Sequence, residues 1–224
     1  MMRPAAIVDI DDTCIDATSR LQAIWSRVLE ADVQIDDVET LDSAQLFEKY
    51  ATDWHRRHTS ELRLRFWNLL LCIDEEGYQL AEVDRPVAGA AEVLSRWCSC
   101  QKVLYLTGRP ENTRELTVRQ LRSFGFPVDD IELVMYRIDD YERTRGASEG
   151  PTLPEVRRGH IRRLVSVYEV TRVIDDYPNY FPLYREAGIP QRIGLNRLRM
   201  FSREQFLEKG ATMVIGDWRE IDTW

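Results

Sequence analysis

The sequence of 224 residues contains little lysine and little cysteine, and it lacks any long apolar run. Only 3 of its 30 basic residues are lysine, and 38 acidic residues give a net charge of -8. Proteins that bind nucleic acid nonspecifically usually carry an excess of positive charge, so this balance argues against that class. No apolar stretch approaches the roughly 20 residues that a membrane-spanning helix needs, and we expect no membrane partner.

Sequence patterns for several common site types are also absent. The four cysteines have neither the density of a disulfide scaffold nor a paired CxxC zinc pattern. The apolar N-terminal run ends at Asp9, too early for a signal peptide, so we expect a reducing, cytoplasmic location. The GxxxxGK[ST] and GxGxxG patterns are missing, which argues against a P-loop kinase and a Rossmann dehydrogenase.

Short apolar runs alternate with helical patterns along most of the chain. Such runs are typical of parallel strands buried on both faces, and the alternation predicts an α/β fold with a doubly wound parallel sheet. The expected strands are residues 5–10, 103–106, 131–136, 172–174, 192–195 and 212–215, and the expected helices are 88–100, 111–124, 154–168 and 180–187. Residues 137–154 are rich in glycine, proline and charge, so we predict a loop there.

Residues 19–85 break this alternation, because their apolar residues have helical spacing and no convincing strand is present. Acidic residues outnumber basic ones in this stretch. We therefore predict an α/β core formed by residues 1–18 and 86–224, with residues 19–85 as a helical cap inserted after the first strand. A cap that gates the substrate and a solvated helical subdomain without a function are both consistent with this pattern.

Polar residues follow three of the expected strands, and in an open parallel sheet such strand ends meet at the ligand-binding edge. They are Asp9 to Thr13, Thr107 to Arg109, and the pair Asp175 and Asp176. Several carboxylates in one place repel one another unless a cation lies among them. Oxygen ligands favour Mg²⁺, which binds carboxylates together with a substrate phosphate. The sequence therefore predicts metal-assisted phosphoryl transfer.

The spacing of Asp9 and Asp11 suits two catalytic roles. Where the chain leaves an extended strand, Asp9 can point at the phosphorus as a nucleophile. Asp11 can then serve as the acid at the leaving oxygen and later as the base for water. We expect the Thr107 hydroxyl to bind a phosphoryl oxygen, with further donors from the backbone N–H groups of Gly108 and Arg109.

Together these segments resemble the phosphatases of the haloacid dehalogenase (HAD) superfamily. Motif I, hhhDxDx[TV], is matched by residues 6–13, motif II by residues 103–107 and motif IV by residues 173–176. The resemblance covers the chain outside the inserted helices, and it implies a HAD-like Rossmannoid core with the family's helical cap in residues 19–85. It also implies a Mg²⁺-dependent phosphomonoesterase that acts on a small phosphorylated substrate.

The resemblance further implies a role for each motif residue. Asp9 becomes the nucleophile and a Mg²⁺ ligand, and Asp11 the acid and base with its backbone carbonyl on the metal. Thr107 becomes the phosphate-binding hydroxyl. Asp176 matches the metal ligand of motif IV, and Asp175 either joins it at the metal or supports it.

Motif III departs from the family pattern. Its usual lysine is replaced by arginine, for which Arg157 is our first choice and the adjacent Arg158 the second. Arginine can pair with phosphate through two hydrogen bonds, but it is bulkier than lysine. The change either reflects the general scarcity of lysine or marks a site that has lost activity. The second interpretation makes the protein a catalytically inactive HAD-like binding module.

A narrower resemblance concerns the 3′-phosphatase domain of phage polynucleotide kinase-phosphatase. That domain has arginines at positions matched here by Arg20, eleven residues after Asp9, and by Arg109. The similarity implies that both bind a substrate phosphate or diester; a surface position for Arg20 and a loop-anchoring salt bridge for Arg109 are the structural alternatives. The acidic insertion argues against a long polyanion, so the expected substrate of this type is a nucleotide or a short oligonucleotide end.

Overall fold

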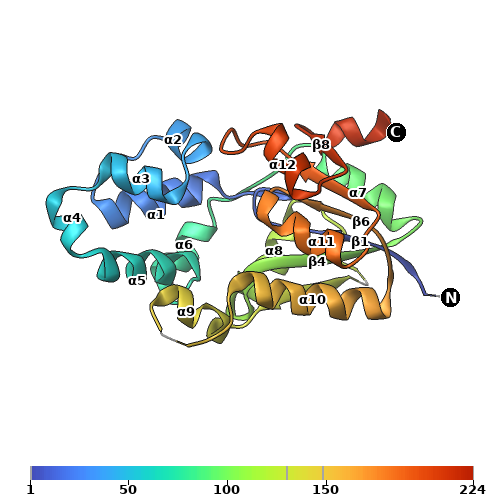
Figure 1. Ribbon diagram of the computed structural model, residues 1–224, viewed down its shortest axis with the longest axis horizontal. Coiled ribbons are helices and arrows are strands. Elements are labelled where there is room, and N and C mark those ends of the chain that lie inside the picture. The colour runs from blue at the N-terminus through green and yellow to red at the C-terminus, as the bar shows by residue number, and fades with distance from the viewer. Residues whose placement is uncertain (1, 130, 148, 224) are drawn as a thin grey trace.

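A six-stranded parallel sheet forms the centre of the molecule, with the strand order β5-β4-β1-β6-β7-β8 (Figure 1). The computed structural model describes residues 2–129, 131–147 and 149–223. The strands are Pro4–Val8 (β1), Lys102–Pro110 (β4), Glu132–Tyr136 (β5), Glu169–Asp175 (β6), Gln191–Leu195 (β7) and Met213–Ile215 (β8). Each segment predicted as a strand overlaps one of these six, and the predicted strand 5–10 ends earlier, at Val8. The α/β fold class predicted from the sequence is confirmed.

Helices cover both faces of this sheet, as a doubly wound fold requires. One face packs against α7 (Ala90–Cys98), α8 (Arg114–Ser123) and the 3-10 helix η4 (Trp218–Thr223), and the other against α10 (Leu153–Val167), α11 (Phe181–Glu186) and α12 (Arg203–Lys209). Strand β1 shows the alternation, because Ala6 and Val8 join the first layer while Ala5 and Ile7 join the second. All four side chains are fully buried, which explains why the strand reads as a continuous apolar run.

A helical segment is inserted between β1 and β4. Its helices are α1 (Thr18–Leu29), α2 (Ile35–Thr40), α3 (Ser43–Tyr50), α4 (Asp53–Arg57), α5 (Thr59–Leu70) and α6 (Glu75–Ala81). They surround an apolar cluster of their own, in which Trp25 and Val28 of α1 meet Leu62 and Leu69 of α5. Within the described ranges, no helix combines the length and the apolar character needed to cross a bilayer.

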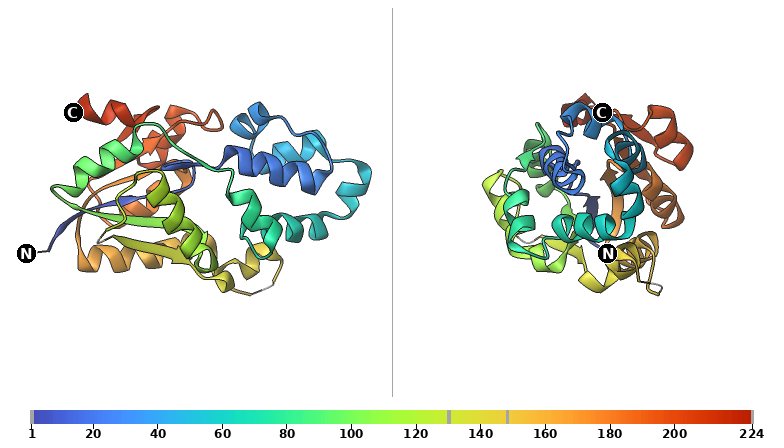
Figure 2. Two further views of the ribbon diagram at one scale, coloured as in Figure 1. Left: turned by 180° about the vertical axis from the view of Figure 1, so that it is seen from behind. Right: turned by 90° about the vertical axis from the view of Figure 1, so that its left-hand side faces the viewer.

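The insertion lies beside the carboxyl ends of the central strands, away from the N-terminal end of β1 (Figures 1 and 2). The chain enters and leaves it through a short antiparallel pair, β2 (Ile15–Asp16) with β3 (Arg85–Pro86). The insertion predicted after the first strand is therefore present. Its division from the core at residues 19 and 85 stays a prediction.

The loop predicted for residues 137–154 is wrong for the first part of that segment. It contains a 3-10 helix, η2 (Ile138–Tyr141), followed by the one-turn helix α9 (Glu142–Arg145). Tyr141 anchors the turn, because its side chain is buried and its hydroxyl donates a hydrogen bond to the backbone carbonyl of Gly108. Most of the neighbouring charged residues face solvent, so the segment has the composition of an unstructured connection.

The packing of β7 against α12 yields a stability prediction. A Cβ atom on Gly194 would lie 2.5 Å from Cδ1 of Phe206. The Gly194→Ala variant should therefore lose about 1–3 kcal/mol of unfolding free energy, the usual cost of overpacking, as measured by urea denaturation. Gly159 in α10 is the matched control, because a Cβ there meets nothing within 4 Å and alanine should add up to about 1 kcal/mol. Equal effects of the two substitutions would contradict the close contact.

Candidate active site

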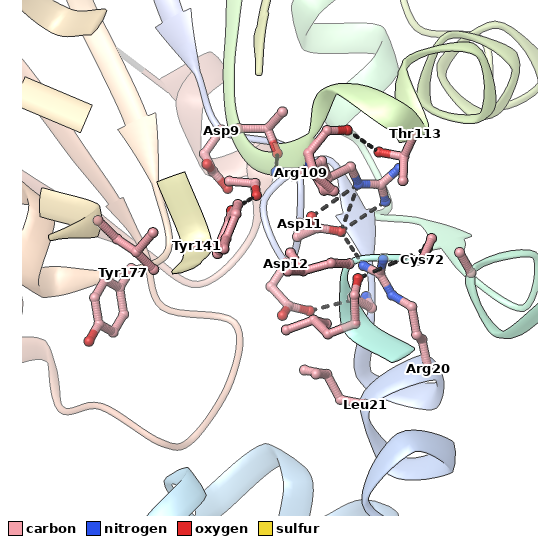
Figure 3. Close-up of a pocket in the computed structure, with 18 of the residues that line it drawn as sticks. Asp9, Asp11, Asp12, Arg20, Leu21, Cys72, Arg109, Thr113, Tyr141 and Tyr177 are labelled. Carbon is pink, nitrogen blue, oxygen red and sulfur yellow. Dashed lines mark hydrogen bonds and ion pairs between the residues drawn. The ribbon is translucent and has the colours of Figure 1, made fainter. Parts of the chain in front are cut away.

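A pocket of about 400 Å³ lies between the strand ends of the core and the inserted helices (Figure 3). Its lining includes Asp9 and Asp11 beyond β1, Thr107 on β4, and Asp176 beyond β6. Strand β1 occupies the place in the sheet where the connections turn to opposite sides, with β4 on one side and β6 on the other. Ligands of open α/β sheets bind at such a point, so this pocket is the candidate active site.

Three carboxylates of this region form a compact cluster. Asp9, Asp175 and Asp176 can each place one oxygen so that all three atoms lie within 4.8 Å of one another. Burial and the charge of Asp175 raise the pKa of Asp9 well above its usual range, and burial and the charge of Asp9 do the same for Asp176. A divalent cation would offset this concentrated negative charge. An all-oxygen donor set fits a hard ion such as Mg²⁺.

The two aspartates of motif IV have different surroundings. Asp175 is fully buried; its Oδ1 accepts from the backbone N–H of Tyr177 at 2.8 Å, and its Oδ2 accepts from the Tyr184 hydroxyl at 2.6 Å and from Arg157. Asp176 lines the pocket and accepts one side-chain hydrogen bond, from Thr13 Oγ1 at 3.2 Å. Asp176 therefore keeps oxygen atoms for a ligand, whereas the hydrogen bonds of Asp175 favour a supporting role.

Arg157 is inserted between the carboxylates and two tyrosines. Its Nη2 donates to Asp9 Oδ1 at 3.0 Å and to Asp175, and its Nε donates to the Tyr184 hydroxyl at 2.9 Å. The ring of Tyr180 lies against the guanidinium, with 4.2 Å between the ring centroid and Cζ. The side chain is only 1% exposed, so a planar cation fills this position completely.

The structure does not bring Arg158 to the same place. Its Nε donates to Glu186 Oε2 at 3.1 Å, its side chain is 36% exposed, and it is not part of the pocket lining. Of the two arginines offered by the sequence for motif III, Arg157 is the one that contacts Asp9. Successive helical residues point about 100° apart, which explains why neighbours in sequence lie in such different surroundings.

Thr107 is buried at the pocket floor, and its Oγ1 accepts from the backbone N–H of Arg109 at 3.1 Å. This contact leaves the hydroxyl proton of Thr107 available to a phosphoryl oxygen. The same contact uses the backbone N–H of Arg109, one of the groups expected from the sequence to donate a hydrogen bond to the substrate. Gly108 and Arg109 both line the pocket, and the Gly108 carbonyl accepts from Tyr141.

Asp11 is held by two arginines. Arg109 Nε lies 3.0 Å from Asp11 Oδ2 and Arg109 Nη2 lies 2.8 Å from Oδ1, while Arg20 Nη2 also contacts Oδ1. Burial opposes the charge on Asp11, but Arg109 and Arg20 outweigh it and hold the pKa of this carboxyl well below its usual range. Asp11 is therefore ionised in this arrangement. Its carboxylate does not belong to the cluster formed by the other three acids.

The same two arginines share a second carboxylate, Asp84, which sequence reasoning missed. Asp84 is fully buried, with its Oδ2 3.0 Å from Arg109 Nη2 and its Oδ1 3.3 Å from Arg20 Nε. Arg20 is 4% exposed, so the interpretation of it as a surface arginine is wrong. Asp84 belongs to no motif and directly precedes β3. Its partners are distant in sequence, so no local pattern signals the contact.

Other contributors had weak signals or none. Tyr180 and Tyr184 lie four residues apart just after motif IV, a helical spacing that could have pointed to a shared face. Trp67 lines the pocket from α5, but a single tryptophan in a helical pattern does not distinguish core from binding site. His55 is buried away from this pocket and caps α4, because its ring Nδ1 accepts a hydrogen bond from the backbone N–H of Thr52.

Comparison with known sequences identifies a distant relative, and no family model matches the chain. A protein of Bacillus cereus, provisionally named a nucleotidase, is 29% identical over 136 residues, which span 60% of this chain and 66% of that protein, slightly less than two thirds of its length.

Solved structures resemble nearly the whole chain. A haloacid dehalogenase-like hydrolase from Streptococcus pneumoniae aligns with a TM-score of 0.66 and 13% identity, over 98% of this chain and 96% of that one. A protein from Lactobacillus delbrueckii, provisionally named a phosphoglycolate phosphatase, aligns with a TM-score of 0.65 and 16% identity, over 99% and 98%. The chain therefore has the fold of the HAD-like hydrolases, as the sequence motifs predicted.

The buried position of Asp84 yields a second stability prediction. Removing one partner of a buried ion pair leaves the other charge uncompensated, which usually costs about 3–5 kcal/mol. We expect Asp84→Ala to lose unfolding free energy on this scale in urea denaturation. Glu82→Ala is the matched control, because Glu82 pairs with Arg119 on the surface and such pairs contribute about 1 kcal/mol or less. A loss at Asp84 no larger than that at Glu82 would show that Arg20 and Arg109 do not depend on it.

Proposed function

We propose that this protein is a Mg²⁺-dependent phosphohydrolase that cleaves phosphomonoesters through an aspartyl-phosphate on Asp9. One observation carries the proposal: Asp9 lies at the end of the central strand in a pocket that also receives Thr107, Arg157 and Asp176. In this proposal Asp9 is the nucleophile, Thr107 the hydroxyl donor, Arg157 the cation and Asp176 the second carboxylate around one space. The sequence motifs and the shared fold support the same reaction class.

Asp9 and Asp176 would hold the metal, because both line the pocket and belong to the acidic cluster. Asp175 would keep Asp9 and Arg157 in place through its own hydrogen bonds. When bound, Mg²⁺ supplies positive charge that offsets the charge of a phosphoryl group and of the carboxylates around it. The backbone carbonyl of Asp11 stays a further proposed ligand.

The residues account for a balanced two-step reaction. An Asp9 oxygen attacks phosphorus and the bond from phosphorus to the ester oxygen breaks, while Asp11 gives a proton to the departing alkoxide. Water then attacks the aspartyl-phosphate, Asp11 takes a proton from that water, and inorganic phosphate leaves with Asp9 restored. The Thr107 hydroxyl and Arg157 would stabilise the phosphoryl oxygens during both steps.

The ion pairs of Asp11 set a condition on this cycle. Arg20 and Arg109 favour the carboxylate form, which suits the base step and opposes the acid step. Asp11 can donate a proton only if one of these contacts loosens when the substrate is bound. Arg20 belongs to α1 of the insertion, so a displacement of that helix would loosen its contact with Asp11, and Asp84 would remain a partner of Arg20.

The two alternative functions have less support. A polynucleotide 3′-phosphatase would need Arg20 and Arg109 to bind a diester, but both are paired with Asp11 and Asp84. An inactive binding module would follow if arginine could not occupy the motif III position. Arg157 nevertheless reaches Asp9, which favours a working site.

The proposal predicts that the purified protein releases phosphate from 4-nitrophenyl phosphate with Mg²⁺ and stops when EDTA removes the metal. Asp9→Asn should lower kcat by a factor of at least about 10³, because the nucleophile is lost. Asp53→Asn, on the surface of α4, is the matched control and should retain full turnover. Undiminished phosphate release by a folded Asp9→Asn protein would exclude the mechanism.

A further prediction concerns the arginine in motif III. Arg157→Lys should lower kcat by roughly 10- to 100-fold, because the shorter lysine side chain lacks the Nε donor to Tyr184 and the planar group that stacks on Tyr180. Arg158→Lys tests the adjacent position and should leave kcat within a factor of two, since Arg158 pairs with Glu186 outside the pocket. If lysine at 157 sustains full activity, the tyrosine contacts have no part in catalysis.

A further inference from the structure

The pocket beside the acidic cluster has two distinct parts, and their contrast indicates the substrate class. We propose that the enzyme prefers phosphomonoesters that carry a single phosphate on an uncharged, flat, apolar leaving group, with Trp67 as the specificity-determining residue. This inference rests on the proposed function and specifies the part of the substrate that leaves.

Apart from Arg20, the residues named here that line the pocket from the insertion are apolar. Leu21 of α1, Trp67 and Leu70 of α5, and Leu71 directly after α5 line it from the insertion, and Tyr141 lines it from the core. The rings of Trp67 and Tyr141 lie 5.8 Å apart, centroid to centroid, with 39° between their planes. Tyr141 is buried, so Trp67 is the aromatic ring of this lining that stays partly exposed. Such a lining favours a flat apolar group over a hydroxyl-rich one, because it offers an aromatic ring and few polar partners.

Trp67 is not enclosed like a core residue. It is only partly buried, and besides this pocket it borders a second, mostly apolar cavity of about 370 Å³ between α1, α3 and α5. Trp25 and Phe47 also line that cavity. Trp67 packs against Tyr141 and Phe66, yet its side chain stays partly exposed beside both cavities, so it is placed to contact a ligand as well.

Each basic side chain among the described lining residues is already paired with an acidic one, so none is free to bind a second anionic group of a substrate. Among the described lining residues the basic side chains are Arg20, Arg109 and Arg157. Arg20 and Arg109 are each paired with Asp11, and Arg157 is paired with Asp9. A metal ion beside Asp9 would serve one phosphate.

A second negative group on the substrate would also meet repulsion. Asp11 keeps 30% of its side chain exposed, and Asp12, which pairs with Arg197, lines the same pocket. A carboxylate or a further phosphate on the leaving group would approach these acids without a free partner, an arrangement that costs affinity. The structure therefore disfavours bisphosphates and phosphorylated carboxylic acids.

The test compares benzyl phosphate with ethyl phosphate and 2-phosphoglycolate in the presence of Mg²⁺. Benzyl and ethyl alcohol are leaving groups of similar acidity, so their ratio of kcat/KM reports contact with the ring. We expect benzyl phosphate to exceed ethyl phosphate at least about tenfold, and 2-phosphoglycolate to be no better than ethyl phosphate. A higher kcat/KM for 2-phosphoglycolate than for benzyl phosphate would overturn the proposal.

The variants assign the preference to a residue. Trp67→Ala should reduce the benzyl to ethyl ratio to below about three, because the aromatic face is lost. Trp54→Ala is the matched control, since Trp54 lies on α4, is 46% exposed and stacks on His58 rather than lining either cavity. It should keep the wild-type ratio. A ratio that survives Trp67→Ala would exclude Trp67 as its source.

The panel also separates the two levels of the argument. Hydrolysis of all three esters without a preference for the ring contradicts the substrate class and leaves the phosphohydrolase proposal standing. Absence of Mg²⁺-dependent hydrolysis of any ester, 4-nitrophenyl phosphate included, contradicts the proposed function itself. Should Trp67→Ala fold poorly, Trp67→Leu keeps an apolar side chain without a ring and should lower the ratio in the same direction.

Discussion

Buried carboxylates are concentrated at one edge of the sheet, and the surrounding structure must compensate their negative charge. Asp9, Asp11 and Asp175 lie within or near a low-dielectric interior, where unpaired negative charge is costly. Arg157 compensates Asp9 and Asp175, and Arg109 compensates Asp11. The charge that these pairs leave uncompensated gathers around Asp9 and faces the pocket, which is why the site suits a divalent cation and a phosphate.

These ion pairs also join the inserted helices to the core. Arg20 of α1 pairs with Asp11 and with Asp84, the residue just before β3. Asp84 also pairs with Arg109 of the core. A further contact joins the insertion to the core, because Asn112 donates to the carbonyls of Leu71 and Cys72 just after α5. The ion pairs of Asp11 thus depend on the position of the insertion relative to the core. The same insertion carries Trp67, so the proposed proton transfer by Asp11 and the proposed contact with the leaving group both depend on that position.

The sequence was informative where local pattern decides the outcome. Continuous apolar runs marked the strands, and the polar residues that end β1, β4 and β6 meet at one edge because parallel strands align there. It was uninformative where a contact joins distant residues with ordinary local surroundings. Asp84 meets Arg109 across 25 positions of sequence, a contact that no motif signals. Segment 137–154 looked irregular because its anchor, Tyr141, is a single buried residue among charged neighbours.

The most direct test of the central claim is a crystal structure of the protein grown with Mg²⁺ and beryllium fluoride, a mimic of the phosphoryl group. The account predicts a beryllofluoride bonded to an Asp9 oxygen, with Mg²⁺ held by Asp9 and Asp176 and a fluoride near the Thr107 hydroxyl. A free Asp9 beside a metal bound elsewhere, at concentrations that saturate the protein, would contradict it.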